Sequence, residues 1–141
     1  MSQVRTVVLD SEAVQALLDP RHPKHRHALA LAEAAAARNL VRAGAVQVVV
    51  PTAVRVESGW VRTDRRSAGI NRLRARDHDL AGSAADTAAA VAAALAVSVA
   101  DAHLAAVLVS TPAPHAALTS DVQDLTRISR HAGVPVQVVR I

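Results

Sequence analysis

The chain has 141 residues, which is enough for one domain with a hydrophobic core and too few for two ordinary domains, so we expect a single domain over residues 1–141. It carries 16 Lys and Arg against 12 Asp and Glu, and the resulting net charge of +4 favours a polyanionic partner. The absence of cysteine excludes thiolate catalysis, cysteine-based zinc sites and disulfides.

The sequence also predicts where the protein resides. Its first residues lack the charged and apolar regions of a secretory signal, and the longest uncharged run, from Thr87 to Ala100, is shorter than the roughly 20 residues that a bilayer span needs. A chain without cysteine suits a reducing compartment. We therefore expect a cytoplasmic protein that does not associate with a membrane.

Short valine-rich runs alternate with longer helical patterns along the chain. The runs are continuously apolar or β-branched, which is typical of parallel strands covered on both faces, and they lie at residues 6–10, 46–50, 116–120 and 136–141. Helices are predicted at 12–18, 24–43, 52–61, 67–77, 85–97, 100–109 and 122–132, with Gly44 and Gly133 each ending a helix shortly before a strand. This order predicts an α/β fold, namely a three-layer α/β/α sandwich around a central, mainly parallel sheet.

Several familiar chemistries are excluded by missing motifs. The five glycines are scattered, so there is no P-loop and no dinucleotide-binding fingerprint, and no G-x-S-x-G marks a serine hydrolase. A phosphoaspartyl hydrolase would need a second aspartate two residues after Asp10, where Glu12 stands, and a later lysine, whereas Lys24 is the only lysine. The histidines of "RHPKHRH" have no metal-site spacing and Pro23 interrupts the helix that would align them, so we interpret this segment as a solvated basic turn.

Four carboxylates occupy positions that an ordinary fold does not explain together. Asp10 and Asp121 follow predicted strands, so both belong at the carboxyl edge of a parallel sheet, where open α/β folds bind ligands. Glu57 has Val54 at i−3 and Val61 at i+4, and Asp101 likewise lies on an apolar helix face, so both are expected to point inward or along a groove. Acids gathered in this way would repel one another, and a hard divalent cation is the usual resolution.

Each of these acids except Glu57 also has a simpler interpretation as a helix cap. Asp10 and Asp121 suit N-cap positions, and two capping-box patterns run from Ser98 to Asp101 and from Ser83 to Asp86. Glu57 lies about five residues into its predicted helix, where neither a cap nor the helix dipole favours it.

The acids sit in motifs that resemble those of the PIN-domain nucleases, in particular the toxins of the VapC type. The chain supplies "VVLDS", "VPTAVRVESGW", "VADAHLAAVLV" and "LTSDVQDLTRI" in the family's order, over nearly its whole length. The resemblance implies that Asp10, Glu57, Asp101 and Asp121 are catalytic and hold the metal. It implies auxiliary ligands or water-holding groups at Asp124, Ser11 and Thr119. The chain departs from the family in its proline-rich "STPAPHAAL" connection and its near absence of aromatic residues.

The resemblance implies a ribonuclease that depends on Mg²⁺ or Mn²⁺, hydrolyses phosphodiester bonds of an RNA substrate, and is the toxin of a type II toxin–antitoxin pair with a small antitoxin protein as partner. The alternative is an inactive PIN-like module that binds RNA or a protein without cutting. Seven arginines between residues 55 and 76 follow the Glu57 motif, and we expect Arg55, Arg62, Arg65 and Arg66 to bind nucleic acid or to form a solvated surface. A homodimer is also expected, and Trp60 belongs either to its interface or to the core.

Overall fold

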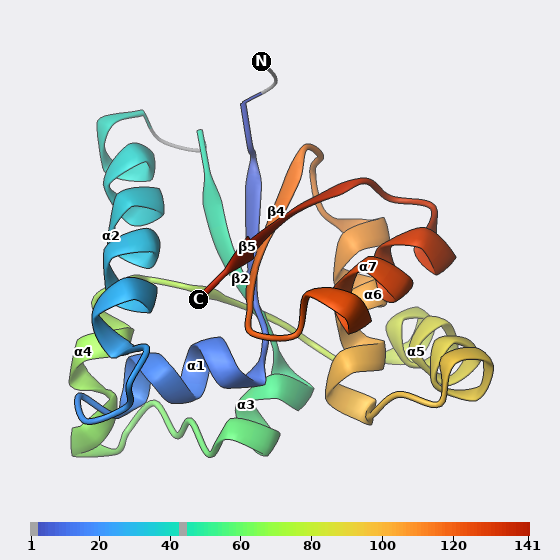
Figure 1. Ribbon diagram of the computed structural model, residues 1–141, viewed down its shortest axis with the longest axis horizontal. Helices are drawn as coiled ribbons and strands as arrows, with labels where there is room; N and C mark the ends of the chain where they lie inside the picture. The colour runs from blue at the N-terminus through green and yellow to red at the C-terminus, as the bar shows by residue number, and fades with distance from the viewer. Residues whose placement is uncertain (1–2, 43–44) are drawn as a thin grey trace.

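The computed structural model describes residues 3–42 and 45–141, and its centre is a five-stranded parallel sheet (Figure 1). The strands are β1 (Thr6–Leu9), β2 (Gln47–Pro51), β3 (Arg76–His78), β4 (His115–Thr119) and β5 (Val136–Arg140), in the order β3-β2-β1-β4-β5. Because every pairing is parallel, all strands end at the same edge of the sheet, which we call the carboxyl edge.

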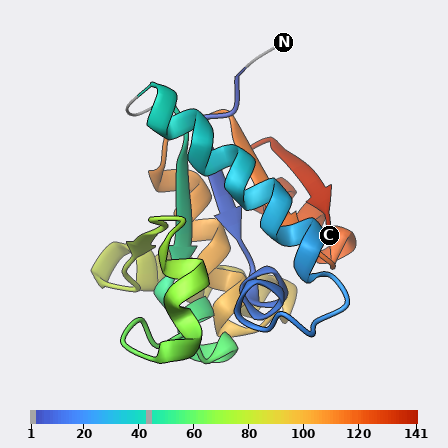
Figure 2. The same ribbon diagram turned by 90° about the vertical axis from the view of Figure 1, so that its left-hand side faces the viewer.

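Helices cover both faces of this sheet. They are α1 (Ser11–Leu18), α2 (His25–Val41), α3 (Thr52–Ser58), a 3-10 turn η1 (Arg65–Ser67), α4 (Ala68–Asn71), α5 (Gly82–Leu95), α6 (Val99–Ser110) and α7 (Val122–Ala132). Helices α1, α2 and α4 lie on one side of the sheet and α5, α6 and α7 on the other, with α2 running across its face (Figure 2). The predicted three-layer sandwich is confirmed.

The continuous apolar strands fill two separate cores, because neighbouring residues of a strand point to opposite faces. Val7 and Leu9 pack into the core under α1 and α2, whereas Val8 packs into the core under α5, α6 and α7. Trp60 is 2% exposed and belongs to the first of these cores, so the core interpretation of Trp60 is confirmed.

Strand β3 is the main correction to the predicted element order, which placed a helix at residues 67–77. The structure instead has the short helix α4 followed by a three-residue edge strand of sequence Arg-Asp-His. This strand pairs only with β2, so its backbone makes the sheet contact while its charged side chains reach solvent. Hydrophobic periodicity cannot reveal a strand of this kind.

Helix α3 ends earlier than its pattern predicted. Gly59 adopts a left-handed conformation with φ of 74°, which ends the helix at Ser58 and leaves Val61 outside it, so the predicted helix at 52–61 is too long. Gly133 ends α7 in the same way, as predicted, with φ of 69°. The predicted stop at Gly44 lies outside the described residues. Within the described ranges, no helix is long and apolar enough to cross a membrane.

Candidate active site at the carboxyl edge

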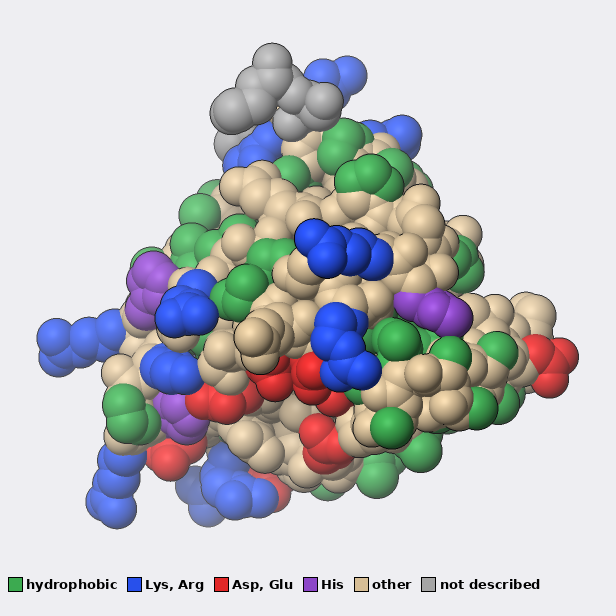
Figure 3. Space-filling view, turned by 45° about the vertical axis from the view of Figure 1, so that its right-hand side comes forward, with side chains coloured by type: hydrophobic (Ala, Val, Ile, Leu, Met, Phe, Trp, Pro, Cys, Tyr) green, Lys and Arg blue, Asp and Glu red, His purple; other side chains and the backbone are tan. Residues whose placement is uncertain are grey.

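The structure brings the four predicted acids to one region of the molecule. Asp10 directly follows β1, and Asp121 follows the neighbouring strand β4 after one residue. Glu57 lies on α3, which begins where β2 ends, and Asp101 lies in the first turn of α6. In the space-filling view, acidic side chains border a hollow and basic side chains flank it (Figure 3).

Helix capping accounts for part of this arrangement. Asp10 and Asp121 are the N-caps of α1 and α7, and each carboxylate accepts a hydrogen bond from the N–H three residues later, at 2.8 and 3.0 Å. Ser98 caps α6 by accepting from the N–H of Asp101 at 3.1 Å. The second predicted box is wrong, because α5 begins at Gly82 without a side-chain cap. Three helix amino ends therefore favour negative charge here.

Asp10 is buried at the centre of this edge, with 7% of its surface exposed. Burial raises the pKa of Asp10, and the nearby charges of Asp101 and Glu12 raise it further. Hydrogen bonds from the Thr119 hydroxyl and a backbone N–H act in the opposite direction. The same Thr119 oxygen accepts from the N–H of Asp121 at 2.9 Å, so it links the two strand-end acids.

Asp101 is half-buried, and the charges of more acidic neighbours raise its pKa than raise the pKa of Asp10. Burial is the main cause that raises the pKa of Asp101, while the Ser98 hydroxyl lowers it. The charges of Glu57, Asp124 and Asp121 raise the pKa further. Asp101 thus couples electrostatically to acids on α3 and at the amino end of α7, which indicates that these carboxylates lie in one electrostatic field.

Cations at this edge pair with only some of the acids. Lys24 donates to Glu12 at 3.1 Å, and Arg127 donates to Asp124 at 3.0 Å. In the described part of the chain, no ion pair involves the four predicted metal ligands, Asp10, Glu57, Asp101 and Asp121. The local cations therefore leave those four negative charges unbalanced.

Two of the four acids are exposed. Glu57 lies one residue before the end of α3, and Asp121 stands at the amino end of α7. Glu57 does line a groove of about 570 Å³, together with the apolar side chains of Val56, Leu80 and Val99. The expectation that it lies along a groove is thus correct, and the inward orientation is wrong.

The predicted auxiliary residues differ in their surroundings. Thr119 is fully buried and bonds to Asp10, as described above, whereas the buried hydroxyl of Ser11 has no hydrogen-bond partner among the described residues. Asp124 is occupied by its ion pair with Arg127. Thr119 and Ser11 therefore remain candidate auxiliary groups, and Asp124 is less available.

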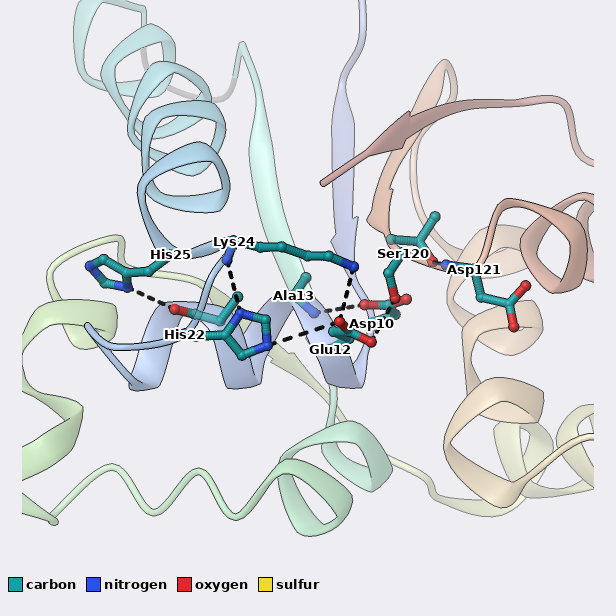
Figure 4. Close-up of polar contacts among 10 residues, drawn as sticks. Asp10, Glu12, Ala13, His22, Lys24, His25, Ser120 and Asp121 are labelled. Atoms are coloured by element: carbon teal, nitrogen blue, oxygen red, sulfur yellow. Dashed lines mark hydrogen bonds and ion pairs between the residues drawn. The ribbon is translucent and has the colours of Figure 1, made fainter.

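The sequence did not predict the polar contacts of Glu12, which lies beside Asp10 (Figure 4). Ser120 donates to Glu12 at 2.7 Å, and Lys24 reaches the other oxygen of the same carboxylate. These contacts lower the pKa of Glu12, with the Ser120 hydrogen bond as the largest cause. The available signals were the unique lysine and a glutamate in the first turn after a strand-end aspartate.

The three histidines of the basic turn contact separate parts of the molecule rather than one ion. His22 Nε2 lies 3.9 Å from Glu12, His25 Nδ1 bonds to the carbonyl of Ala16 at 2.7 Å, and His27 Nε2 lies 3.1 Å from the carbonyl of Arg140. Two of these contacts tie the start of α2 to α1 and β5. The turn is therefore anchored by hydrogen bonds rather than merely solvated, as the sequence had suggested.

The predicted nucleic-acid-binding arginines also differ from one another. Arg55 and Arg62 both donate to Asp77, at 2.8 and 2.7 Å, and both guanidinium groups lie over the Trp60 ring. Arg66 bonds to Asp64 at 3.2 Å. Arg65 is exposed, and the part of the chain described here gives it no ion pair. Two of the four thus have a packing role that the sequence did not indicate.

The donor set suits a hard divalent cation in type and charge. Its members are carboxylates that form no ion pair among the described residues, and burial raises the pKa of two of them, Asp10 and Asp101. The buried hydroxyl of Ser11, which has no hydrogen-bond partner among these residues, directly follows Asp10. Within residues 3–42 and 45–141, however, no three acidic or histidine side chains are already gathered closely enough to hold an ion. The side chains at this edge therefore suit a divalent cation in their chemistry, but they do not form a complete coordination shell among the described residues.

Comparisons with known proteins bear on the fold. The chain is similar to a chain in the crystal structure of VapBC2 from Rickettsia felis bound to a DNA fragment from their promoter, with a TM-score of 0.58 and 10% sequence identity. The match covers 96% of this chain and 98% of that one. No family model matches the sequence, and no curated protein does. At this identity the likeness shows the fold, and the predicted PIN-like fold is confirmed.

Proposed function

We propose that this chain is a ribonuclease of the VapC type, which hydrolyses RNA phosphodiester bonds with Mg²⁺ or Mn²⁺. The observation that supports it most is the unbalanced charge of Asp10, Glu57, Asp101 and Asp121 at one edge, where the nearby cations pair with other acids. Such repulsion is costly unless a cation offsets it. The PIN-like fold agrees with the proposal.

In this proposal the four acids hold the metal, and the neighbouring hydroxyls keep them in place. The bound ion would supply an activated water and offset negative charge at the phosphate. Burial alone would favour the protonated form of Asp10, and the Thr119 hydroxyl acts in the opposite direction by lowering the pKa of that carboxyl. Ser120 and Lys24 hold Glu12 beside Asp10. The charge of Glu12 is therefore paired with Lys24, whereas no described cation pairs with Asp10.

The proposed partners are an RNA substrate, a small antitoxin protein and a second copy of the chain. The antitoxin is suggested by the solved VapBC2 structure, whose fold this chain shares. Exposed valines beside Glu57 offer an apolar surface, because Val56 is 84% exposed and Val99 62%. Since Trp60 is buried in the core, an interface must use these residues or another surface.

Cleavage of a labelled single-stranded RNA tests the proposal. Wild type should cut with Mn²⁺ and lose activity in EDTA, and Asp101→Asn should lose at least about a hundredfold, since removal of one electrostatic element commonly costs that much. Asp86→Asn is the matched control, because Asp86 is an exposed acid on α5. Full cleavage by Asp101→Asn, or cleavage that survives EDTA, would contradict the proposal.

One observation favours the alternative of a PIN-like binding module that does not cut. The acids of residues 3–42 and 45–141 do not already form a group that could hold an ion. An inactive module would bind RNA equally in wild type and Asp101→Asn and would cut in neither.

A further inference from the structure

Three exposed arginines lie between the end of α4 and the start of the edge strand β3. Arg72, Arg74 and Arg76 are exposed, and they alternate with Leu73 and Ala75, which are 7% and 6% exposed and pack into the core. The alternation anchors the segment through its apolar residues. Arg74 has a φ of 54°, an uncommon conformation for a residue other than glycine, at the turn that directs the segment toward β3.

The three arginines line a cavity rather than a flat surface. The cavity has a volume of about 220 Å³, and its apolar wall includes Val46 and Val48 of the β2 region. Because Val46 precedes β2 and Arg72 precedes β3, this cavity lies toward the amino ends of the parallel strands. It is therefore distinct from the acidic carboxyl edge.

Among the described residues, no acid forms an ion pair with any of these three arginines. Arg55, Arg62 and Arg66 each bond to an aspartate, but the ion pairs of the described residues include none of the three at the cavity. Three guanidinium groups within five residues repel one another, and a bound anion relieves that repulsion. The planar fork of arginine matches the oxygens of a phosphate.

Strand β3 connects this cavity to the proposed cleavage edge. Asp77 follows Arg76 directly and bonds to Arg55 on α3, the helix that carries Glu57. A strand advances about 3.3 Å per residue, so the two ends of the neighbouring five-residue strand β2 are about 15 Å apart. An extended RNA strand is long enough to reach both.

We propose that Arg72, Arg74 and Arg76 form a second phosphate-binding site, which holds the backbone of the substrate RNA away from the bond that is cut. The inference rests on the proposed function for the identity of the RNA as substrate. The cavity binds phosphodiester groups, and its guanidinium groups donate hydrogen bonds to the phosphate oxygens. Because the cavity lies beside β3, the bound RNA runs along the β3 edge of the sheet.

Binding of a fluorescein-labelled 12-nucleotide single-stranded RNA tests this site, measured by anisotropy in EDTA between 50 and 200 mM salt. The variant Arg72→Gln/Arg74→Gln/Arg76→Gln should bind about tenfold more weakly at the lower salt, and its salt slope should fall by about 2, since each phosphate contact on a single strand contributes about 0.7. The matched control is Arg26→Gln/Arg130→Gln/Arg140→Gln. It removes three exposed arginines on the β5 side of the sheet and should keep the wild-type slope.

Thermal unfolding verifies that both triple variants fold. Equal weakening in the two variants, or no weakening in the first, would overturn the proposal. Displacement of the RNA by adenosine monophosphate at micromolar concentration would also overturn it, because the cavity would then hold a free nucleotide. Cleavage in Mn²⁺ separates the two proposals. A wild type that binds through these arginines without cutting refutes only the nuclease, and one that cuts while the first triple variant binds normally refutes only this site.

Discussion

Asp101 is held between two opposing influences. Its place in the first turn of α6 favours a negative charge, while burial and the charges of Glu57, Asp124 and Asp121 raise its pKa. The position of Asp101 in the helix therefore stabilises its negative charge, whereas burial and the neighbouring acids destabilise that charge. We expect the cost to disappear when a cation is bound, which links the local electrostatics to the proposed activity.

His103, two residues further along α6, is a fully buried base. Its Nδ1 accepts from the N–H of Ala53 at 3.4 Å, and its Nε2 lies 3.0 Å from His78, whose other nitrogen lies 2.8 Å from Ser110. Burial, and to a smaller degree the charge of His78, lowers the pKa of His103 to about 4. The side chain is therefore neutral at neutral pH.

This lowered pKa predicts a loss of stability in mild acid. The unfolded chain takes up the His103 proton below pH 6.5 and the folded chain only near pH 4, so stability is complete above 6.5 and is lost as the pH falls toward 4. The free energy of unfolding should fall by about 2 kcal/mol between pH 7 and pH 5 from this residue. Urea unfolding of wild type, His103→Gln and the exposed control His27→Gln would measure it.

The raised pKa values of Asp10 and Asp101 act in the opposite direction, since their folded forms bind protons more readily than the unfolded chain. Because wild type and both histidine variants contain Asp10 and Asp101, comparing their pH dependence removes the contribution of these two acids. His103→Gln should show a flatter pH dependence than wild type, and His27→Gln should match wild type. Identical pH dependence in all three proteins would refute the assignment.

At the scale of elements, one aspartate joins β3 to the α3 region. Asp77 accepts from Arg55 on α3 and from Arg62 in the following segment, and Arg62 also donates to the carbonyl of Ala75 at 2.9 Å. Both guanidinium groups lie over Trp60, so the ion pairs and the core tryptophan form one unit. This unit keeps the edge strand beside β2 and the Glu57 helix.

Removing the Asp77 charge should weaken this unit and free its arginines. Asp77→Asn should lower the free energy of unfolding by about 1 kcal/mol, because each half-exposed ion pair contributes roughly 0.2–1 kcal/mol. It should also tighten RNA binding more than Asp86→Asn does, since both substitutions remove one negative charge but only the first releases Arg55 and Arg62. Anisotropy in EDTA compares the two. Equal affinities would indicate that the arginines have only a packing role.

The sequence predicted the elements whose signal is apolar, and it missed those held by backbone and charge. The apolar and β-branched runs located β1, β2, β4 and β5, and α7 was predicted at its observed ends. Strand β3 has no apolar residue, and α3 was predicted too long because the left-handed conformation of Gly59 is visible only in the structure. The same limit applied to the site, where strand-end position located Asp10 and Asp121 but could not give the exposure of Glu57.

Across the whole molecule, the parallel topology separates the two kinds of charge. Carboxylates lie where strands β1 and β4 end. The arginines of residues 72–76, which form no ion pair with any residue that the structure describes, lie toward the opposite end of the sheet. The hydrogen bond from Ser120 to Glu12 could not be predicted, because it joins residues that lie 108 positions apart in the sequence. A polyanion that spans both regions would be attracted by the arginines of residues 72–76, and it would need a bound cation at the carboxylates.

The exposed valines beside Glu57 predict self-association. Val56 and Val99 line the groove of about 570 Å³, and we expect a second copy of the chain to cover them. Sedimentation velocity should show a dimer at high protein concentration, and Val56→Ser/Val99→Ser should shift it to monomer. Val109→Ser is the control, because Val109 is 51% exposed at the other end of α6. Monomer alone in wild type at high concentration would refute the dimer.

The central claim is that Asp10 and Asp101 belong to one metal site, and thermal unfolding with EDTA and then with excess Mn²⁺ tests it most directly. Without metal, Asp10→Asn and Asp101→Asn should be at least as stable as wild type, because each removes a repelled charge and asparagine at position 10 still caps α1. Asp10→Ala should be less stable by roughly 0.5–2 kcal/mol through loss of the cap.

Mn²⁺ should then stabilise wild type and the control Asp86→Ala by about 2.7 kcal/mol at a concentration one hundred times Kd, since an ion that binds only the folded state adds RT ln(1 + [L]/Kd). Asp10→Ala and Asp101→Ala should gain far less, because each lacks a ligand of the site. Equal Mn²⁺ shifts in wild type, Asp10→Ala and Asp101→Ala would contradict the account and leave Asp10 as a helix cap and Asp101 as a first-turn residue without a metal.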